Sequence, residues 1–487
     1  MALGPLDYDT QSIVFSLADT PTLLALSRTS KSHAAQARPL ILRDVSLSRD
    51  PAQVVNFQRF VAANGLGHHI RKLFIRRGAF HPNPPICAPR YTYDDADPSE
   101  PEVVARAVAE VLAEAHHLRV LCIDKFAQDL LTMEPRLGKV LTSCMYLTDL
   151  TLWDVVIDSL KSLNGLRGLR QLTLVIACRS MVDLIIWPNY LHVSKNSSVA
   201  TLILNSSSTL ESLTLRGFHL ESFLNDPTIS FPKVQNLSYL DCTATLKDQE
   251  RAFPAVRSVH FDPTPFPKTT VLSAFSPFWL DLESIHAYAS FMRIFHNVRT
   301  LRRLGLRDHL HPGPEWPDAQ LLLNQLGSNN HLVSLSLQIS DPASIVLQAI
   351  LKETPKLVFL EVTLRSYEPA HVAIVREMLV NPVPPSPLAS ASSIKYLSIA
   401  LAPSVTSWIS FGPDNPSPAT RDVFVHNWMK ALPHLRYMDI SLENDVNFWD
   451  RRVWHSSSIQ DSLQLLSQAD GDSIRSWYDS EWWRCRS

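Results

Sequence analysis

The stretch HLVSLSL, residues 331–337, contains the pattern that decides the fold. Side chains of a β-strand point alternately to its two faces, so Leu335 and Leu337 share one face while Ser334 and Ser336 share the other. Leu332 precedes the strand and can pack the turn that leads into it. The pattern therefore predicts a short strand with one face in an apolar core.

The same template recurs along almost the whole chain, with Ile, Val, Met or Phe in place of some leucines. Twelve segments match it, which is far more than chance gives for three apolar positions. A thirteenth segment, DLESIHA at 281–287, is a weaker match. The twelve segments are residues 69–75, 117–123, 146–152, 168–174, 209–215, 233–239, 255–261, 300–306, 331–337, 356–362, 393–399 and 434–440.

Helical patterns stand between these strands. Residues 101–115 have a proline near their start, and residues 341–353 offer Asp341 as N-cap with Pro342 in the first turn. Residues 368–380 and 420–432 are similar. Strands that alternate with helices lie side by side and parallel, with the helices outside. The predicted fold is α/β: a leucine-rich-repeat solenoid with parallel strands on its concave face.

The spacing of the strands is irregular. Their central apolar residues stand 22 to 48 residues apart, whereas regular leucine-rich repeats hold about 20–29 residues. The long steps contain polar, proline-rich stretches, which indicate surface loops. A doubly wound α/β enzyme is the alternative, but it would have fewer strands and glycine-rich turns, and the chain has 13 glycines in 487 residues. The proline-rich stretches are 80–102, 311–318, 381–387 and 411–418.

Composition and motifs favour a protein without catalytic residues. The 45 Lys+Arg and 47 Asp+Glu give a net charge of −2, so there is no basic footprint for nucleic acid. The sequence has none of the common phosphate-loop, dinucleotide, nucleophile-elbow or zinc-protease motifs. The six widely spaced cysteines indicate free thiols. We therefore expect no enzymatic activity, no metal site and no cofactor.

The termini and apolar runs bear on location. The N-terminal sequence lacks the features of a secretory signal, and the longest apolar runs are far shorter than the roughly 20 residues that span a bilayer. We expect a protein with no membrane partner, located in the cytoplasm, the nucleus or both.

The first 48 residues have a different pattern from the rest. Residues 6–47 contain no strand template and predict three short helices. The first spans about 9–18. The second has Thr20 as a candidate cap and Pro21 in its first turn, and the third spans about 30–37 and should end near Pro39.

This N-terminal stretch resembles an F-box, the adaptor-binding module of SCF (Skp–cullin–F-box) ubiquitin ligase receptors. Asp7 stands where the family has proline, and the tryptophan common in the family's third helix is absent. A short F-box followed by irregular leucine-rich repeats is similar to the F-box proteins of mushroom-forming fungi. The positions that match the family are Leu6, Ile13, Leu17, Leu23, Leu26, Ser30, Lys31, Leu40 and Val45.

The resemblance implies a substrate-recognition subunit of an SCF-type E3 ubiquitin ligase. Its N-terminal helices would bind a Skp-type adaptor and through it a cullin ligase, and its repeats would bind a protein substrate. The alternative is a non-catalytic leucine-rich-repeat scaffold whose N-terminal helices only cap the solenoid; a cap would bury all of its apolar side chains. The candidate adaptor-binding residues, divided between the helical core and the interface, are Leu6, Ile13, Leu17, Leu23, Leu24 and Leu26.

The strand template also identifies the side chains of the concave face, which are the two positions that flank the central apolar residue. In the C-terminal strands these positions form an aromatic column beside an acidic column. An exposed aromatic column is a typical anchor for a protein partner. The alternative is that a loop such as 381–392 or 411–421 covers it. The predicted partner-binding residues are Phe359, Glu361, Tyr396, Tyr437 and Asp439.

We therefore predict three regions. Residues 1–48 form the F-box-like helical segment and residues 49–457 the irregular repeat array. Residues 458–487 form a C-terminal cap that is largely helical, because a solenoid needs an atypical last unit over its core. Five of the 11 tryptophans lie in or near this cap, at Trp449, Trp454, Trp477, Trp482 and Trp483.

Overall fold

The computed structural model shows two compact units, Met1–Ala255 and Val256–Ser487. Each is built from parallel strands, and the fold is the predicted α/β leucine-rich-repeat solenoid. The structure describes residues 8–80, 99–176, 191–262, 279, 281–287, 298, 300–310, 331–339, 352–364, 393–401, 425–426, 428–430, 432, 434–443, 449–455 and 464–478.

The first unit contains a parallel sheet in which neighbouring strands follow chain order. The central leucines are register partners from one strand to the next, as in Leu73 with Leu121 and Leu150 with Leu172. All of them are buried. The strands are β1 (Asp44–Leu47), β2 (Lys72–Ile75), β3 (Val120–Ile123), β4 (Asp149–Val155), β5 (Gln171–Ile176), β7 (Ser212–Arg216) and β9 (Asn236–Leu240). A separate pair consists of β6 (Leu191–His192) and β8 (Phe218–His219).

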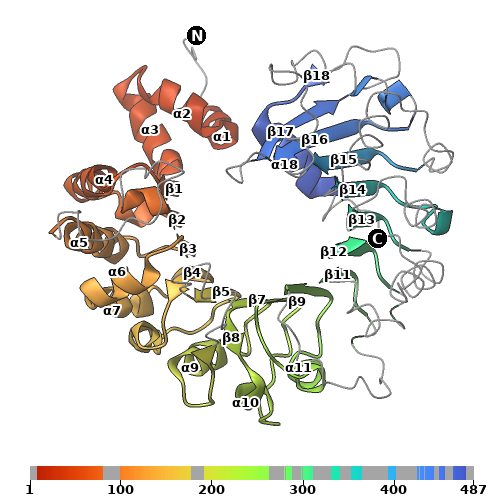
Figure 1. The fold of residues 1–487 in the computed structure, drawn as a ribbon. Helices are drawn as coiled ribbons and strands as arrows, with labels where there is room; N and C mark the ends of the chain where they lie inside the picture. The colour runs from red at the N-terminus through yellow and green to blue at the C-terminus, as the bar shows by residue number, and fades with distance from the viewer. Residues whose placement is uncertain are drawn as a thin grey trace. The chain divides into compact units, whose positions relative to one another are not determined.

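The helices of the first unit lie along the outer side of this sheet (Figure 1). Helix α5 (Ser99–Glu114) confirms the helix expected at 101–115, and it buries Val104, Val108 and Val111. The others are α4 (Pro51–Asn64), α6 (Ala127–Met133), α7 (Arg136–Ser143), α9 (Ser198–Leu204), α10 (Glu221–Leu224) and α11 (Leu246–Ala252), with short 3-10 helices η1 (Gly67–His69), η2 (Arg77–Ala79) and η4 (Ser159–Leu163).

Three helices precede the first strand, as the sequence predicts: α1 (Tyr8–Leu17), α2 (Thr20–Ser27) and α3 (Lys31–Ile41). Two details differ. Asp19 caps α2 in place of Thr20, and its carboxylate accepts a hydrogen bond from the Thr22 N–H at 2.9 Å. Helix α3 continues through Pro39 to Ile41, because a proline near the end of a helix removes one donor while the next N–H groups still bond.

In the second unit seven parallel strands are followed by an antiparallel return. Strand β11 shows that the weaker template match at 281–287 is also a strand, so all thirteen segments form strands. The parallel strands are β10 (Ser258–Asp262), β11 (Ser284–Ala287), β12 (Arg303–Leu310), β13 (Ser334–Ile339), β14 (Phe359–Leu364), β15 (Tyr396–Leu401) and β16 (Tyr437–Glu443). The predicted helices at 341–353, 368–380 and 420–432 and the loops at 311–318, 381–392 and 411–421 lie wholly or mostly outside the described residues.

The C-terminal region contains strands as well as the helix expected within residues 458–487. Strand β17 (Trp449–His455) pairs antiparallel with β16, and β18 (Gln464–Leu465) pairs with β17. Helix α18 spans Gln468–Ser476, inside the predicted cap. Trp454 is fully buried within β17, whereas Trp477 is partly exposed. The tryptophans at 482 and 483 lie outside the described residues.

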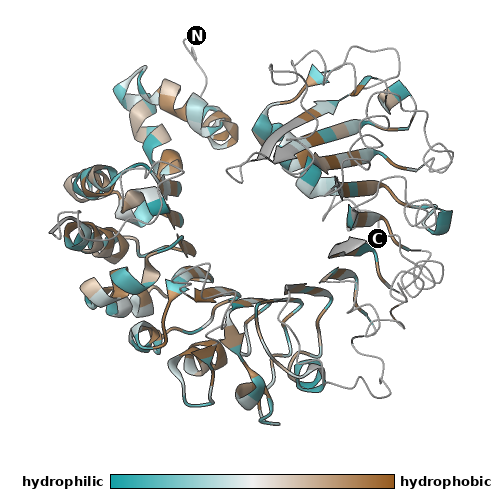
Figure 2. Ribbon diagram, viewed as in Figure 1, coloured by the Kyte–Doolittle hydropathy of each residue, from teal (hydrophilic) through white to brown (hydrophobic). Residues whose placement is uncertain are grey.

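Figure 2 shows hydrophobic residues recurring along the strands and along the helices beside them. This is the repeated core that the template predicts: the alternate strand residues Leu335, Leu337 and Leu360 are all fully buried. Among the described residues, no helix has the length and apolar character needed to cross a membrane.

Candidate protein-interaction surfaces

The three N-terminal helices have a small core of their own. Phe15, Leu23 and Ala37, one from each helix, are buried together. Leu26 is partly buried against them, with Ala18, Leu40 and Ile41. Two of the predicted adaptor-binding residues, Leu23 and Leu26, therefore hold the helices together.

Three other predicted adaptor-binding residues remain exposed. Ile13 is 60% exposed, Leu17 is 82% exposed and Leu24 is 42% exposed. Ile13 and Leu17 lie four residues apart on α1 and so share a side of that helix. Leu6 lies outside the described residues. A helical unit that served only as a cap would bury these side chains, and this one does not.

In the first unit, the strand side chains that point to the concave face, away from the core, are mostly half-exposed and polar. Thr151, Thr173 and Thr214 occupy equivalent positions on β4, β5 and β7 and are all half-exposed. At the N-terminal edge Lys72 forms a 3.3 Å ion pair with Asp44. Surface pairs of this kind contribute little to stability, because both side chains stay largely in water.

In the second unit the predicted aromatic column is covered. Phe359 and Tyr396 are fully buried, and they pack with Val358, Val453 and Tyr478. Tyr437 is half-buried, and its ring centroid lies 5.5 Å from that of Tyr478. The expectation of an exposed aromatic column is therefore wrong for these residues, because Tyr478 and the preceding helix α18 lie over it.

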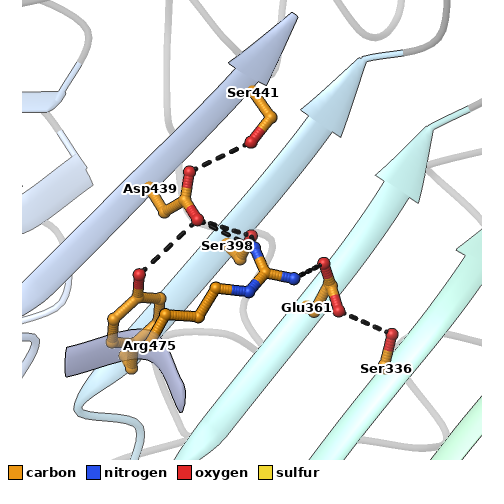
Figure 3. Close-up of polar contacts among 7 residues, drawn as sticks. Ser336, Glu361, Ser398, Asp439, Ser441 and Arg475 are labelled. Atoms are coloured by element: carbon orange, nitrogen blue, oxygen red, sulfur yellow. Dashed lines mark hydrogen bonds and ion pairs between the residues drawn. The ribbon is translucent and has the colours of Figure 1, made fainter. Parts of the chain in front are cut away.

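The acidic column beside it, formed by Glu361 and Asp439, is also covered, because an arginine of the same chain binds both carboxylates. Arg475 on α18 donates from Nη1 to Asp439 Oδ2 at 2.9 Å and to Ser398 Oγ at 3.1 Å. Its Nη2 pairs with Glu361 Oε1. Figure 3 shows the guanidinium between the two carboxylates. Asp439 and Ser398 are fully buried, and Glu361 is mostly buried.

Burial and charge act in opposite directions on Arg475. Burial by itself lowers the pKa of the Arg475 guanidinium, but the Glu361 and Asp439 carboxylates outweigh it and raise the pKa above its usual value. Arg475 therefore stays charged, and a mostly buried cation compensates a fully buried carboxylate. A charge of this kind is costly to bury unless it is paired and hydrogen-bonded.

Sequence reasoning identified Glu361 and Asp439 but did not identify Arg475, Ser398 or Tyr478 as part of this site. Ser398 could have been found, because the strand template places it between the two acids. Arg475 and Tyr478 follow the repeats in a segment that has no template. Among the described residues, no group of three or more His, Cys, Asp or Glu side chains is arranged to hold a metal ion.

Comparisons with known proteins add little. No protein-family model matches the chain, and no curated protein matches it. Among solved structures it is similar to the one titled "Crystal structure of Rad7 and Elc1 complex in yeast", with a TM-score of 0.36 and 15% sequence identity. The match covers 81% of this chain and 94% of that chain. A likeness of this degree carries no argument about either surface.

Proposed function

We propose that this chain is the substrate-recognition subunit of an SCF-type E3 ubiquitin ligase. In this role α1–α3 bind a Skp-type adaptor, which connects the chain to a cullin ligase, and the repeats bind a protein substrate. The chain contributes no catalytic residue. It acts by raising the effective concentration of the substrate near the ligase.

One observation carries the proposal. In a segment whose sequence resembles an F-box, Ile13, Leu17 and Leu24 expose large apolar side chains while the core of the same helices is complete without them. Exposed aliphatic side chains on a small helical unit are typical of protein interaction sites. The alternative function, a repeat scaffold with a helical cap, offers no reason for this exposure.

The structure also shapes the test. Removing residues 1–48 would remove β1 (Asp44–Leu47), which pairs with β2. The deletion would therefore leave the backbone of β2 without its neighbouring strand. A point substitution is cleaner: Leu17→Asp places a charge on the exposed side of α1. Met145→Asp is the matched control, because Met145 is 88% exposed and lies between α7 and β4, three strands along the sheet from β1.

The experiment is a pulldown of the full-length chain with a purified Skp-type adaptor and cullin. We expect the wild-type chain and Met145→Asp to bind equally, and Leu17→Asp to bind at least about tenfold more weakly, since a charge in an apolar interface stays unpaired. Circular dichroism checks that both variants are folded. If the folded wild-type chain does not bind the adaptor, or if Leu17→Asp binds as well as the control, the scaffold function is favoured.

A further inference from the structure

Helix α18 and the residues just after it contact the concave face of the second unit, and Arg475 and Tyr478 enter the two columns. They lie three residues apart, so they project from the same side of a helical segment. Arg475 enters the acidic column and Tyr478 enters the aromatic column. The two columns therefore form two adjoining subsites, one for a guanidinium and one for an aromatic ring.

The guanidinium subsite is built by the strands. Glu361, Ser398 and Asp439 are register partners on β14, β15 and β16. Ser336 Oγ donates to Glu361 Oε2 at 2.8 Å, and Ser441 Oγ donates to Asp439 Oδ1 at 3.1 Å. In each carboxylate one oxygen is bonded to a serine of a neighbouring position while the other faces Arg475 (Figure 3). The Asp439 Oδ2 atom that faces Arg475 also accepts from Ser398 Oγ at 3.3 Å and from the Tyr396 hydroxyl at 3.5 Å. Serines of the sheet thus orient both acids toward one cation.

The aromatic subsite is likewise a feature of the sheet. Phe359, Tyr396 and Tyr437 are register partners, and the Phe359 and Tyr396 ring centroids lie 5.2 Å apart. The Tyr478 ring lies 5.6 Å from Tyr396 and 5.5 Å from Tyr437. These separations are those of favourable aromatic pairs. A ring from any segment placed here would meet the same two tyrosines.

Helix α18 is held on the unit by few buried residues. It is nine residues long, and its sequence, QADGDSIRS, is mostly polar. Of its residues only Gly471 is buried, with Ile474 and Arg475 partly buried. A helix of this length is marginal on its own. Its position therefore depends on Arg475, on Ile474, on Tyr478 just beyond its end, and on the close contact of Gly471 with Val453 of β17.

We propose that this concave site on β13–β16 binds a helical segment of a partner protein that carries an arginine and, three residues later, an aromatic residue. Helix α18 occupies the site in cis and competes with that segment. The acidic column gives charge complementarity for arginine, and its fixed carboxylate pair favours the planar guanidinium over lysine. That the partner is a ubiquitination substrate rests on the proposed function; the binding site does not.

The test uses a fluorescently labelled peptide with the sequence of residues 464–478 and the full-length chain in three forms. Arg475→Ala weakens the hold of α18 on the site. Ser473→Ala is the control, because Ser473 is an exposed residue of the same helix. Binding is measured by fluorescence anisotropy. No adaptor is present, so the outcome is independent of the adaptor-binding proposal.

We expect the peptide to bind the Arg475→Ala chain at least about tenfold more tightly than the wild-type or Ser473→Ala chain, because a competitor in cis reduces the available fraction of sites. A peptide with alanine at the position of Arg475 should not bind. Adding Asp439→Asn to the Arg475→Ala chain should weaken binding at least about tenfold. Equal binding to all three forms, or binding to none, overturns the proposal.

A second measurement needs no variant and covers the case in which Arg475→Ala does not fold. Hydrogen exchange on the wild-type chain compares backbone amides of α18 with those of β14–β16. A displaceable helix opens locally, so its amides should exchange at least about tenfold faster than those of the strands. If α18 exchanges only as fast as the strands beneath it, the helix is a fixed part of the unit and the proposal fails.

Discussion

The concave faces of the two units use one strand template and differ in what covers them. Each strand places two side chains on the concave face, one on either side of its central apolar residue. In the first unit the second of these is Thr151 on β4, Thr173 on β5 and Thr214 on β7, and each is half-exposed. The equivalent residues of the second unit include Ser398 and Asp439, which are fully buried. The backbone alternation is the same, so the difference lies outside the strands.

The covering segment explains the contrast. In the second unit α18 and Tyr478 lie over β14–β16. The concave-face side chains of these strands are therefore buried, and they form a second core that is partly ionic. Strand alternation therefore determines the face to which a side chain points. Whether that face meets solvent depends on a segment distant in the sequence.

The largest difference should come from one substitution made on both faces. Phe359→Ala removes a fully buried ring on β14 and should lower the free energy of unfolding by about 4 kcal/mol. Phe74→Ala removes a half-exposed ring on β2 and should cost about 1 kcal/mol. Urea denaturation of the full-length variants measures both values. Equal losses would mean that the outward faces of the two units are equally covered.

The inward positions should show no such contrast. Leu172 on β5 and Leu335 on β13 are both buried central residues of the template. Leu172→Ala and Leu335→Ala should each lower the free energy of unfolding by about 3 kcal/mol, since each leaves a cavity in a repeat core. The same urea series measures both. A loss below about 1 kcal/mol in either unit would show that its repeats are loosely packed.

The thirteen template strands were predictable because each carries its own signal. An apolar alternation with period two needs no knowledge of distant residues, and even DLESIHA at 281–287, with isoleucine and alanine at the last two apolar positions, forms β11. Local capping was less certain. Thr20 and Asp19 are both good N-caps, and the choice between them depends on where the first turn begins.

The site was predictable only in part. The template placed Glu361 and Asp439 side by side, because parallel strands in register align equivalent positions. It could not show that Arg475, 36 residues after Asp439, would lie against them. That contact is a tertiary pairing between a polar helix and two acids, and neither sequence alone has a pattern that requires the other.

The ionic part of the covered face gives the third prediction. Asp439→Asn keeps the shape of the side chain but removes the charge that pairs with Arg475 at 2.9 Å. It should lower the free energy of unfolding by about 2 kcal/mol, which is typical for a buried charged hydrogen bond. Asp149→Asn on β4 is the control on the open face and should change it by less than about 0.5 kcal/mol. Identical effects would show that Arg475 contributes nothing to the cover.

The smallest expected effect is a difference in the rate at which a reagent alkylates a thiol on each concave face. Cys122 on β3 and Ser398 on β15 hold the same template position, half-exposed and fully buried respectively. In a Ser398→Cys chain at pH 8, iodoacetamide should alkylate Cys122 at least about tenfold faster than the new thiol, as measured by mass spectrometry of each site. Adding Arg475→Ala should remove most of this difference, because it weakens the cover. Equal rates in the chain that retains Arg475 would show that α18 does not shield β15.

The pH dependence provides an internal check on the same experiment. Burial raises the pKa of the Cys122 thiol, with Arg76 opposing and Asp124 adding to the shift. Because the thiolate is the reactive form, its alkylation rate should keep rising beyond the pH at which a free thiol levels off. Burial raises the pKa of Cys242 to about 12, so this residue should stay unmodified at pH 8 in every folded variant. Alkylation of Cys242 would mean that the first unit has opened, and in that case the rate at Cys122 would no longer report the native concave face.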